Sequence, residues 1–136
     1  MSSDLRKLTS TRIREARTLL DAGEWSGAYY LAGYAIETGL KVCISTFYKK
    51  YQIVDPKIGK GVYTHNLIEL VNLANLSSNL ANEIKTDRTF AVQWAVVKDW
   101  NESSRYDIWS ESDARDLYRA IKLRRHGVLR WVKRHW

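Results

Sequence analysis

Residues 26–48, SGAYYLAGYAIETGLKVCISTFY, constrain the fold more than any other stretch of this chain. Read at 3.6 residues per turn, the stretch gives a helix that is apolar on nearly all sides, and such a helix lies at the centre of a domain. One face is small and apolar and is expected to be core: Ala28, Leu31, Ala32, Ala35, Gly39, Leu40, Cys43 and Phe47. A second face carries tyrosines and charges: Tyr30, Tyr34, Glu37, Lys41, Ser45 and Tyr48. The sequence therefore predicts a central helix with an acid and a base embedded in it.

Glu37 and Lys41 stand four residues apart, with the glutamate on the N-terminal side, so they can pair across one helical turn. Such a pair stabilises an exposed helix by about 0.2–0.5 kcal/mol. Because tyrosines and small residues flank the pair, we expect it to be partly buried, and partly buried charges are kept where they fix geometry or meet a ligand. The alternative is a plain helix-stabilising pair.

Three short segments of this chain resemble HEPN domains, the higher eukaryotes and prokaryotes nucleotide-binding family. The small and aromatic run followed by Glu37-x-x-x-Lys41 resembles the second HEPN helix. Thr64-His65-Asn66-Leu67-x-x-Leu70 resembles the segment that opens the helix after a variable loop, and Ser104-Arg105-Tyr106-Asp107 resembles the junction ahead of the last long helix. The resemblance implies an all-α, HEPN-like up-down bundle of four main helices plus one or two short ones. It also implies a homodimer with the second and last helices near the seam.

The length of 136 residues predicts a single domain, 1–136, which buries roughly 68% of the surface of the unfolded chain. The polar start, MSSDLRKLTS, does not read as a signal peptide, and no apolar run reaches 18 residues, so a cytoplasmic protein without a membrane partner is expected. Cys43 is the one cysteine, which excludes a disulfide framework. Metal-ligand spacings are absent, so no metal and no cofactor are predicted.

The net charge of +7 lies entirely at the C-terminal end. Residues 115–136 hold eight lysines and arginines against Asp116, whereas the acids and bases of residues 1–114 balance. A basic segment on a neutral body is typical of proteins that bind polyanions. We expect a basic C-terminal helix at 111–136 whose candidates for RNA or nucleotide binding are Lys122, Arg124, Arg125 and Arg130. Trp131 and Trp136 could stack on unpaired bases, or enter an anionic membrane surface.

Local signals divide the rest of the chain into helices. A first helix is predicted over Ser3–Ala22, with Gly23 at the position of a C-terminal cap. A loop is expected at 50–64, followed by a helix that opens with a capping box at Asn66-x-x-Glu69. A break is expected at Ser77-Ser78-Asn79 and an interruption at Asp87. The last helix is expected to have its cap at Ser110 or Ser112 and a kink or end of packing at Gly127. The Trp-rich FAVQWAVVKDW is expected to be helical from its context, although its β-branched residues leave a strand open.

HEPN ribonucleases carry an Arg-x(4–6)-His motif that acts on the scissile phosphate across a homodimer interface, and this chain has two formal matches. Arg119-x6-His126 places both residues on one face of a helix, because seven residues make two turns. Arg130-x4-His135 places them far apart around it. The usual position is not filled, since Arg105 has no histidine within reach downstream. If cleavage occurs, Arg119 and His126 are the preferred pair; otherwise they belong to a solvated basic helix face.

These features predict a HEPN-like protein that binds RNA or a nucleotide in a toxin–antitoxin or defence system. Metal-independent endoribonuclease activity is left open, because the usual Arg-x(4–6)-His position is not filled. The resemblance implies that Glu37 and Lys41 face the dimer cleft as part of the catalytic site, together with Arg119 and His126. Arg105 and Tyr106 could meet a nucleotide phosphate and base, or anchor the last helix. His65 is interpreted as a packing or capping residue.

Two other hypotheses remain open. The first is a non-catalytic HEPN module that dimerises and docks a nucleotide, a nucleotidyltransferase partner or an antitoxin. The second is a structural interaction protein whose basic tail contacts nucleic acid or acidic lipid without specificity.

Overall fold

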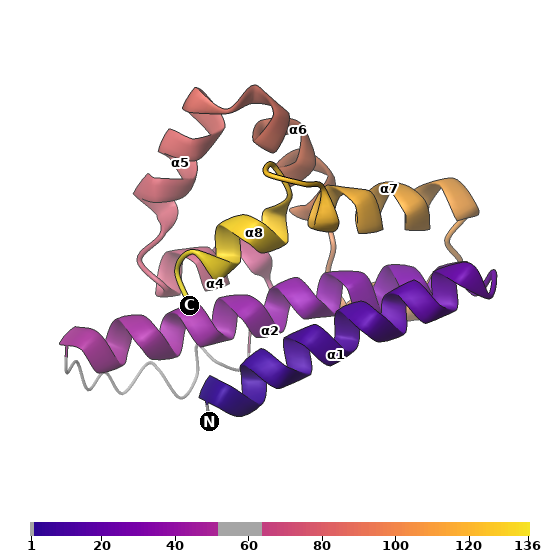
Figure 1. Ribbon diagram of the computed structural model, residues 1–136, viewed down its shortest axis with the longest axis horizontal. Helices are drawn as coiled ribbons and strands as arrows, with labels where there is room; N and C mark the ends of the chain where they lie inside the picture. Colours follow the sequence, from indigo (N-terminus) through magenta and orange to yellow (C-terminus); the bar gives the residue numbers. More distant parts are fainter. Residues whose placement is uncertain (1, 52–63) are drawn as a thin grey trace.

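The computed structural model describes residues 2–51 and 64–136, and these residues form helices and no strand (Figure 1). The elements in chain order are α1 (Ser2–Asp21), α2 (Trp25–Tyr51), α4 (Leu67–Leu73), α5 (Ser77–Thr86), α6 (Arg88–Val97), the 3-10 helix η1 (Glu102–Tyr106), α7 (Glu111–Lys122) and α8 (Val128–Lys133). The predicted all-α class is confirmed. Most of the loop predicted at 50–64 lies outside the described residues. None of these helices is long and apolar enough to cross a membrane.

The two longest helices, α1 and α2, form an antiparallel hairpin along one side of the molecule (Figure 1). The turn between them contains Gly23, whose φ of +78° lies in the left-handed region that favours glycine. The backbone N–H of Gly23 donates to the carbonyl of Leu20 at 3.2 Å, which closes the end of α1. The predicted first helix and its glycine stop are confirmed.

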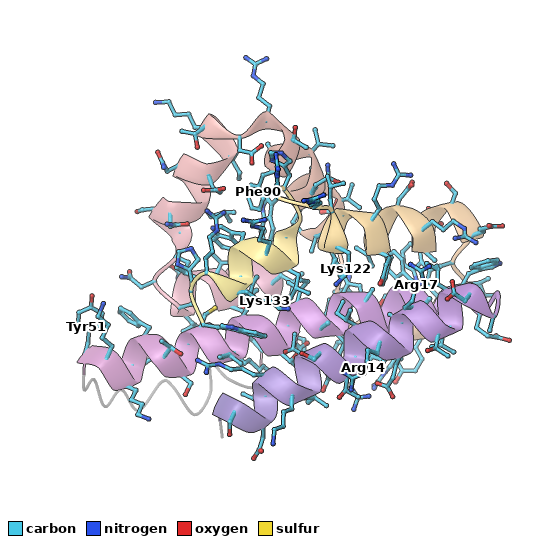
Figure 2. The ribbon with its side chains drawn as sticks, viewed as in Figure 1. Arg14, Arg17, Tyr51, Phe90, Lys122 and Lys133 are labelled. Carbon is cyan, nitrogen blue, oxygen red and sulfur yellow. The ribbon has the colours of Figure 1, made fainter. Side chains whose placement is uncertain are left out.

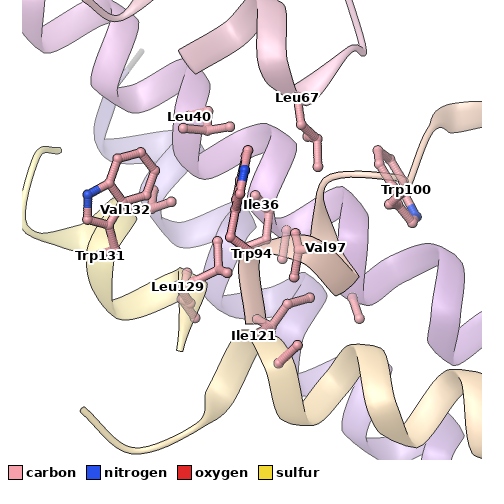
Figure 3. Packing of buried hydrophobic residues seen from close by; sticks show 14 of the residues in the cluster. Ile36, Leu40, Leu67, Trp94, Val97, Trp100, Ile121, Leu129, Trp131 and Val132 are labelled. Atoms are coloured by element: carbon pink, nitrogen blue, oxygen red, sulfur yellow. The ribbon is translucent and has the colours of Figure 1, made fainter. Parts of the chain in front are cut away.

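The predicted central position of α2 is also confirmed. It packs against α1, α4, α7, α8 and η1, so its side chains meet neighbours on most sides. Figure 3 shows Ile36 and Leu40 of α2 beside Trp131, Val132 and Leu129 of α8. The buried surface of α2 is wider than the small, apolar face that was predicted to be core. Several residues outside that face are buried as well: Tyr29, Gly33, Ile36, Thr38, Val42 and Ile44.

Short polar side chains set where the smaller helices begin. Asn66 accepts from the N–H of Glu69 at 3.0 Å at the start of α4. Asp87 accepts from the N–H of Phe90 at 3.0 Å and divides α5 from α6, so FAVQWAVV is helical as expected. Ser110 forms a reciprocal capping box with Asp113 at the start of α7. At the predicted 77–79 break a helix does begin, but no side chain caps it.

The basic segment predicted as one helix over 111–136 is instead two helices, α7 and α8, joined by a turn. Two long helices and five shorter ones thus replace the four main helices expected, within the described residues. Gly127 makes the turn possible because an added Cβ would lie 2.6 Å from the carbonyl oxygen of Ile121 and 2.7 Å from that of Leu123. The turn lets α8 fold back and bury Val128, Trp131 and Val132.

Trp131 is therefore not available to stack on a base. Its side chain is buried against the rings of Phe90 and Trp94, and its Nε1–H donates to Asn79 Oδ1 at 2.8 Å. The indole holds α8 against α5 and α6, which is a structural role.

Candidate functional site

Glu37 is the one carboxylate side chain that is fully buried in the part of the chain that the structure describes. Its two oxygens have different partners. Oε2 lies 3.2 Å from Lys41 Nζ, and Oε1 lies 2.8 Å from His65 Nδ1. A buried carboxylate is tolerated only when it is paired and hydrogen-bonded, and here both oxygens meet that condition. The pairing of Glu37 with Lys41 was predicted; the contact with His65 was not.

His65 lies between two carboxylates. Its Nδ1 faces buried Glu37, and its Nε2 lies 3.0 Å from Oε2 of Glu102, the first residue of η1. Only an imidazolium ring can donate from both nitrogens, so the positively charged form satisfies both contacts. Glu37, Lys41, His65 and Glu102 are called the Glu37 cluster below. The exposed fraction of the side chain rises from 1% for Glu37 to 36% for His65 and 49% for Glu102, so the cluster opens to solvent at Glu102.

The segment before α4 holds His65 in place. Thr64 donates its hydroxyl to Glu69 at 2.5 Å and accepts from the N–H of Asn66 at 3.2 Å, while Asn66 caps the helix. The predicted capping box is thus half formed, because the Glu69 side chain bonds Thr64 instead of the Asn66 backbone. This local network fixes the backbone on both sides of His65. The capping role considered for His65 is wrong, because Asn66 is the cap, and the His65 side chain instead contacts Glu37.

A close approach of Trp100 to α2 sets the position of η1. An added Cβ on Gly33 would lie 2.2 Å from the Trp100 indole, so the ring rests on the backbone of α2 one turn before Glu37. Trp100 is only two residues before Glu102. The packing of Trp100 on Gly33 therefore brings η1 to α2, and Glu102 to His65. Tyr34 lies on the same side, and its pKa is raised by burial first and then by the negative charge of Glu37.

Arg105 and Tyr106 lie at the solvent side of η1. The Arg105 guanidinium stacks 4.7 Å from the centre of the Tyr106 ring, and the Tyr106 residue is 76% exposed. Tyr106 is therefore not an anchor for the following helix. That role belongs to Trp109, which stacks on Tyr29 at 3.8 Å and donates its Nε1–H to the carbonyl of Ser104 at 3.0 Å. Arg105 also neighbours Tyr30 of α2, so this exposed pair borders the face of α2 that carries Glu37.

Arg119 and His126 do not share a helix face, because α7 ends at Lys122 between them. Arg119 has a 71% exposed side chain whose nearest carboxylate oxygen, on Asp116, is 4.0 Å away. His126 lies in the turn after α7 and contacts Asp87 through Nδ1 at 2.7 Å. The expectation that these two residues lie on one face of a helix is wrong.

The four predicted basic residues of the C-terminal segment are all exposed: Lys122, Arg124, Arg125 and Arg130. Two of them, Lys122 and Arg130, line a shallow groove of about 240 Å³ together with Lys133 and the apolar side chains of Ile121, Leu123 and Leu129. Lys122 and Lys133 are labelled in Figure 2. This basic groove brings three positive charges together, with no carboxylate among its lining residues. Arg124 and Arg125 lie in the α7–α8 turn beside it.

The described residues contain no group of three or more His, Cys, Asp or Glu side chains placed to hold a metal ion. No protein-family model matches the sequence, and comparisons with curated proteins and with solved structures find no significant match. The geometry of the Glu37 cluster and of the basic groove is thus the basis for a functional proposal.

Proposed function

We propose that this chain is a HEPN-like protein that binds RNA or a nucleotide at the Glu37 cluster. One observation carries the proposal: the three segments that resemble HEPN domains converge on one face of α2. Glu37 and Lys41 come from α2, His65 from the segment before α4, and Glu102, Arg105 and Tyr106 from η1. Glu37 and His65 are 28 residues apart in sequence, and a chance similarity of short segments would not by itself bring them into contact.

The Glu37 cluster is suited to bind a phosphate group. His65 Nε2 already holds an anionic oxygen, that of the half-exposed Glu102. A ligand phosphate that displaces this carboxylate keeps the charge balance and gains the nearby guanidinium of Arg105 and the ring of exposed Tyr106. The buried Glu37 stays in place and orients His65 and Lys41. Glu102 then competes with the ligand for His65, and Glu37, Lys41 and His65 form the binding site.

The basic groove supports an RNA chain as the larger ligand. Lys122, Arg130 and Lys133 project positive charge from neighbouring positions of α7 and α8. Contacts of this kind neutralise phosphates without reading sequence, so they add affinity that falls as salt rises.

A second candidate function is metal-independent RNA cleavage with His65, in place of His126, as the acid–base group. The contact between buried Glu37 and His65 Nδ1 favours it, because it orients the ring, and a substrate that displaces Glu102 from Nε2 can exchange a proton with that nitrogen. Incubation of RNA with the protein in EDTA tests this candidate. Equal cleavage by wild type and by His65→Ala would exclude His65 as the catalytic group.

We also propose that the protein acts in the cytoplasm as a homodimer, with a nucleotidyltransferase or antitoxin as a further partner. This part rests on the resemblance alone, because Glu37 is buried by its own chain and needs no second copy to cover it. Light scattering coupled to gel filtration measures the mass directly. A mass of one chain at micromolar concentration would reject the homodimer and leave the Glu37 cluster unaffected.

Fluorescence anisotropy with a short unpaired RNA tests the binding proposal. His65→Ala is expected to weaken binding about tenfold or more, since it removes a charge-assisted hydrogen bond. Glu102→Gln is expected to tighten binding because it removes the competing charge. Glu111→Gln is the control, because Glu111 is a similarly exposed glutamate that pairs with Arg115 instead. Unchanged affinity in both His65→Ala and Glu102→Gln would contradict the proposal.

A further inference from the structure

A concave site lies at the C-terminal end of α2, away from the Glu37 cluster. It is an open cleft of about 430 Å³ between the last turns of α2, the link from α4 to α5 and the final residues of the chain. It is called the C-terminal cleft below. Ten residues separate Glu37 from Phe47, the first aromatic residue in this cleft, which is about 15 Å along a helix. Figure 2 shows Tyr51 at the end of α2 that lies farthest from the α1–α2 turn.

Three aromatic side chains surround the cleft: Phe47, Tyr51 and Trp136. Phe47 and Tyr51 are one turn apart on α2, with ring centres 5.0 Å from each other, and Tyr51 is 57% exposed. Trp136 is only partly buried. Rings of this size normally bury most of their surface, so a group of incompletely covered rings around a cavity is suited to stack on a flat apolar ligand.

The charges of the cleft are positive. Lys50 and Arg134 line it, and none of its described lining residues is an aspartate or glutamate. Arg134 pairs with Glu83 of the neighbouring helix α5 at 2.9 Å. Lys50 lies over the Tyr51 ring, 5.5 Å from its centre, so a cation and an aromatic face are next to each other. This juxtaposition favours a ligand with an aromatic ring and an attached anion.

Two further side chains can read the edge of such a ring. Asn75 lines the cleft from a turn in which its φ is +60°, a conformation that asparagine adopts more readily than most residues. His135 also lines it, and burial, followed by the charge of Arg134, lowers the pKa of His135. The lowered pKa favours the uncharged ring, which offers one donor and one acceptor.

We propose that the C-terminal cleft binds a nucleotide unit, with the base against Phe47, Tyr51 and Trp136 and the phosphate at Lys50 and Arg134. The volume of about 430 Å³ lies within the range of small-molecule sites. The unit is a free mononucleotide or an unpaired nucleotide of an RNA chain. No residue of the Glu37 cluster lines the cleft, so this site is independent of the function proposed above.

Calorimetric titration of the full chain with AMP and with a short unpaired oligoadenylate tests the inference. Tyr51→Ala is expected to weaken binding about tenfold or more, the usual effect of removing a stacking ring, whereas Tyr51→Phe retains the ring and the affinity. Lys50→Glu is expected to weaken binding as well. Lys85→Glu, which changes an exposed lysine of α5 outside the cleft, is the matched control and should leave affinity unchanged.

The outcomes separate this site from the Glu37 cluster and separate the two ligand sources. Binding of AMP that depends on Tyr51 supports a free nucleotide, and Tyr51-dependent binding of the oligonucleotide alone supports an RNA chain. Ribose 5-phosphate that binds as tightly as AMP would overturn base recognition. If His65→Ala abolished all binding while Tyr51→Ala left it unchanged, nucleotide binding in the cleft would be rejected and the proposed function would stand. If neither AMP nor the oligoadenylate bound, the proposed nucleotide site in the cleft would be rejected as well.

Discussion

Glu37 shows how a single buried charge organises its surroundings. Its carboxylate holds a cation on its own helix, Lys41, and a ring from a segment 28 residues away, His65. The tyrosines around it predicted partial burial, and the structure extends this to complete burial within one chain. Removing either partner leaves a buried carboxylate oxygen without a hydrogen bond, which is the reason the three residues form one unit.

Gly33 is the residue on which the placement of η1 depends. Gly33→Ala is expected to destabilise the fold by about 1–3 kcal/mol, because its Cβ would lie 2.2 Å from the rigid Trp100 indole. Gly27→Ala on the same helix is the matched control. Its Cβ would lie 3.1 Å from the end of the flexible Leu19 side chain, which can move aside.

Urea denaturation of the two variants measures the difference. The difference in the free energy of unfolding between the two variants is the informative quantity, because both substitutions raise the helix propensity equally. Equal stability of Gly33→Ala and Gly27→Ala would show that Trp100 does not rest on α2 as described.

At the scale of elements, Asp87 connects two parts of the chain that are far apart in sequence. It caps α6, and its other oxygen contacts His126 in the turn between α7 and α8, 39 residues later. The pKa of Asp87 is lowered, first by the hydrogen bond from the Phe90 amide and then by that from His126. The charged form of Asp87 therefore stabilises the junction of these elements.

Asp87→Asn tests this junction through pH. A carboxyl whose pKa is lower in the folded state contributes stability above its unfolded value of 3.8, and loses it as pH falls through the folded pKa. The variant, which keeps a capping oxygen, is expected to be less stable than wild type at pH 6 and equally stable near pH 2. Asp99→Asn, at an aspartate with a 76% exposed side chain, should show little difference at any pH. A constant gap for Asp87→Asn from pH 6 to pH 2 would contradict the charge contribution.

Elements whose ends carry local signals were predictable. Gly23, Asp87 and Ser110 each start or stop a helix where their side chain or backbone conformation dictates. Gly127 marked a kink inside 111–136, but the end of α7 already at Lys122 was not predictable, because Leu123, Arg124 and Arg125 are compatible with a helix. There the burial of Trp131 and Val132 against other elements outweighs local propensity.

The candidate site was half predictable for the same reason. Glu37 and Lys41 belong to one helix, so their spacing predicts that they pair. His65 and Glu102 reach them only through the tertiary fold, and no local pattern links a histidine before one helix to a glutamate at the start of another. Arg119 and His126 failed as a pair because the helix that would have aligned them ends at Lys122.

For the whole molecule, the long α2 carries two separate candidate sites on one rigid element. The Glu37 cluster lies near its middle, and the C-terminal cleft lies at its final turns. The basic groove on α7 and α8 adds positive charge without a carboxylate in its lining. The proposed functions thus fall on different parts of the fold: ligand binding at the Glu37 cluster, nucleotide binding in the C-terminal cleft and general attraction of a polyanion at the basic groove. Each can be tested by a separate substitution.

The central claim is that His65 is the phosphate-binding residue of the Glu37 cluster, and NMR of the histidine rings tests it most directly. The chain has three histidines, so their ring signals can be assigned with three single substitutions. On titration with a short unpaired RNA, a saturable shift of the His65 ring signals is expected. Saturable RNA binding that leaves the His65 signals unmoved would contradict it.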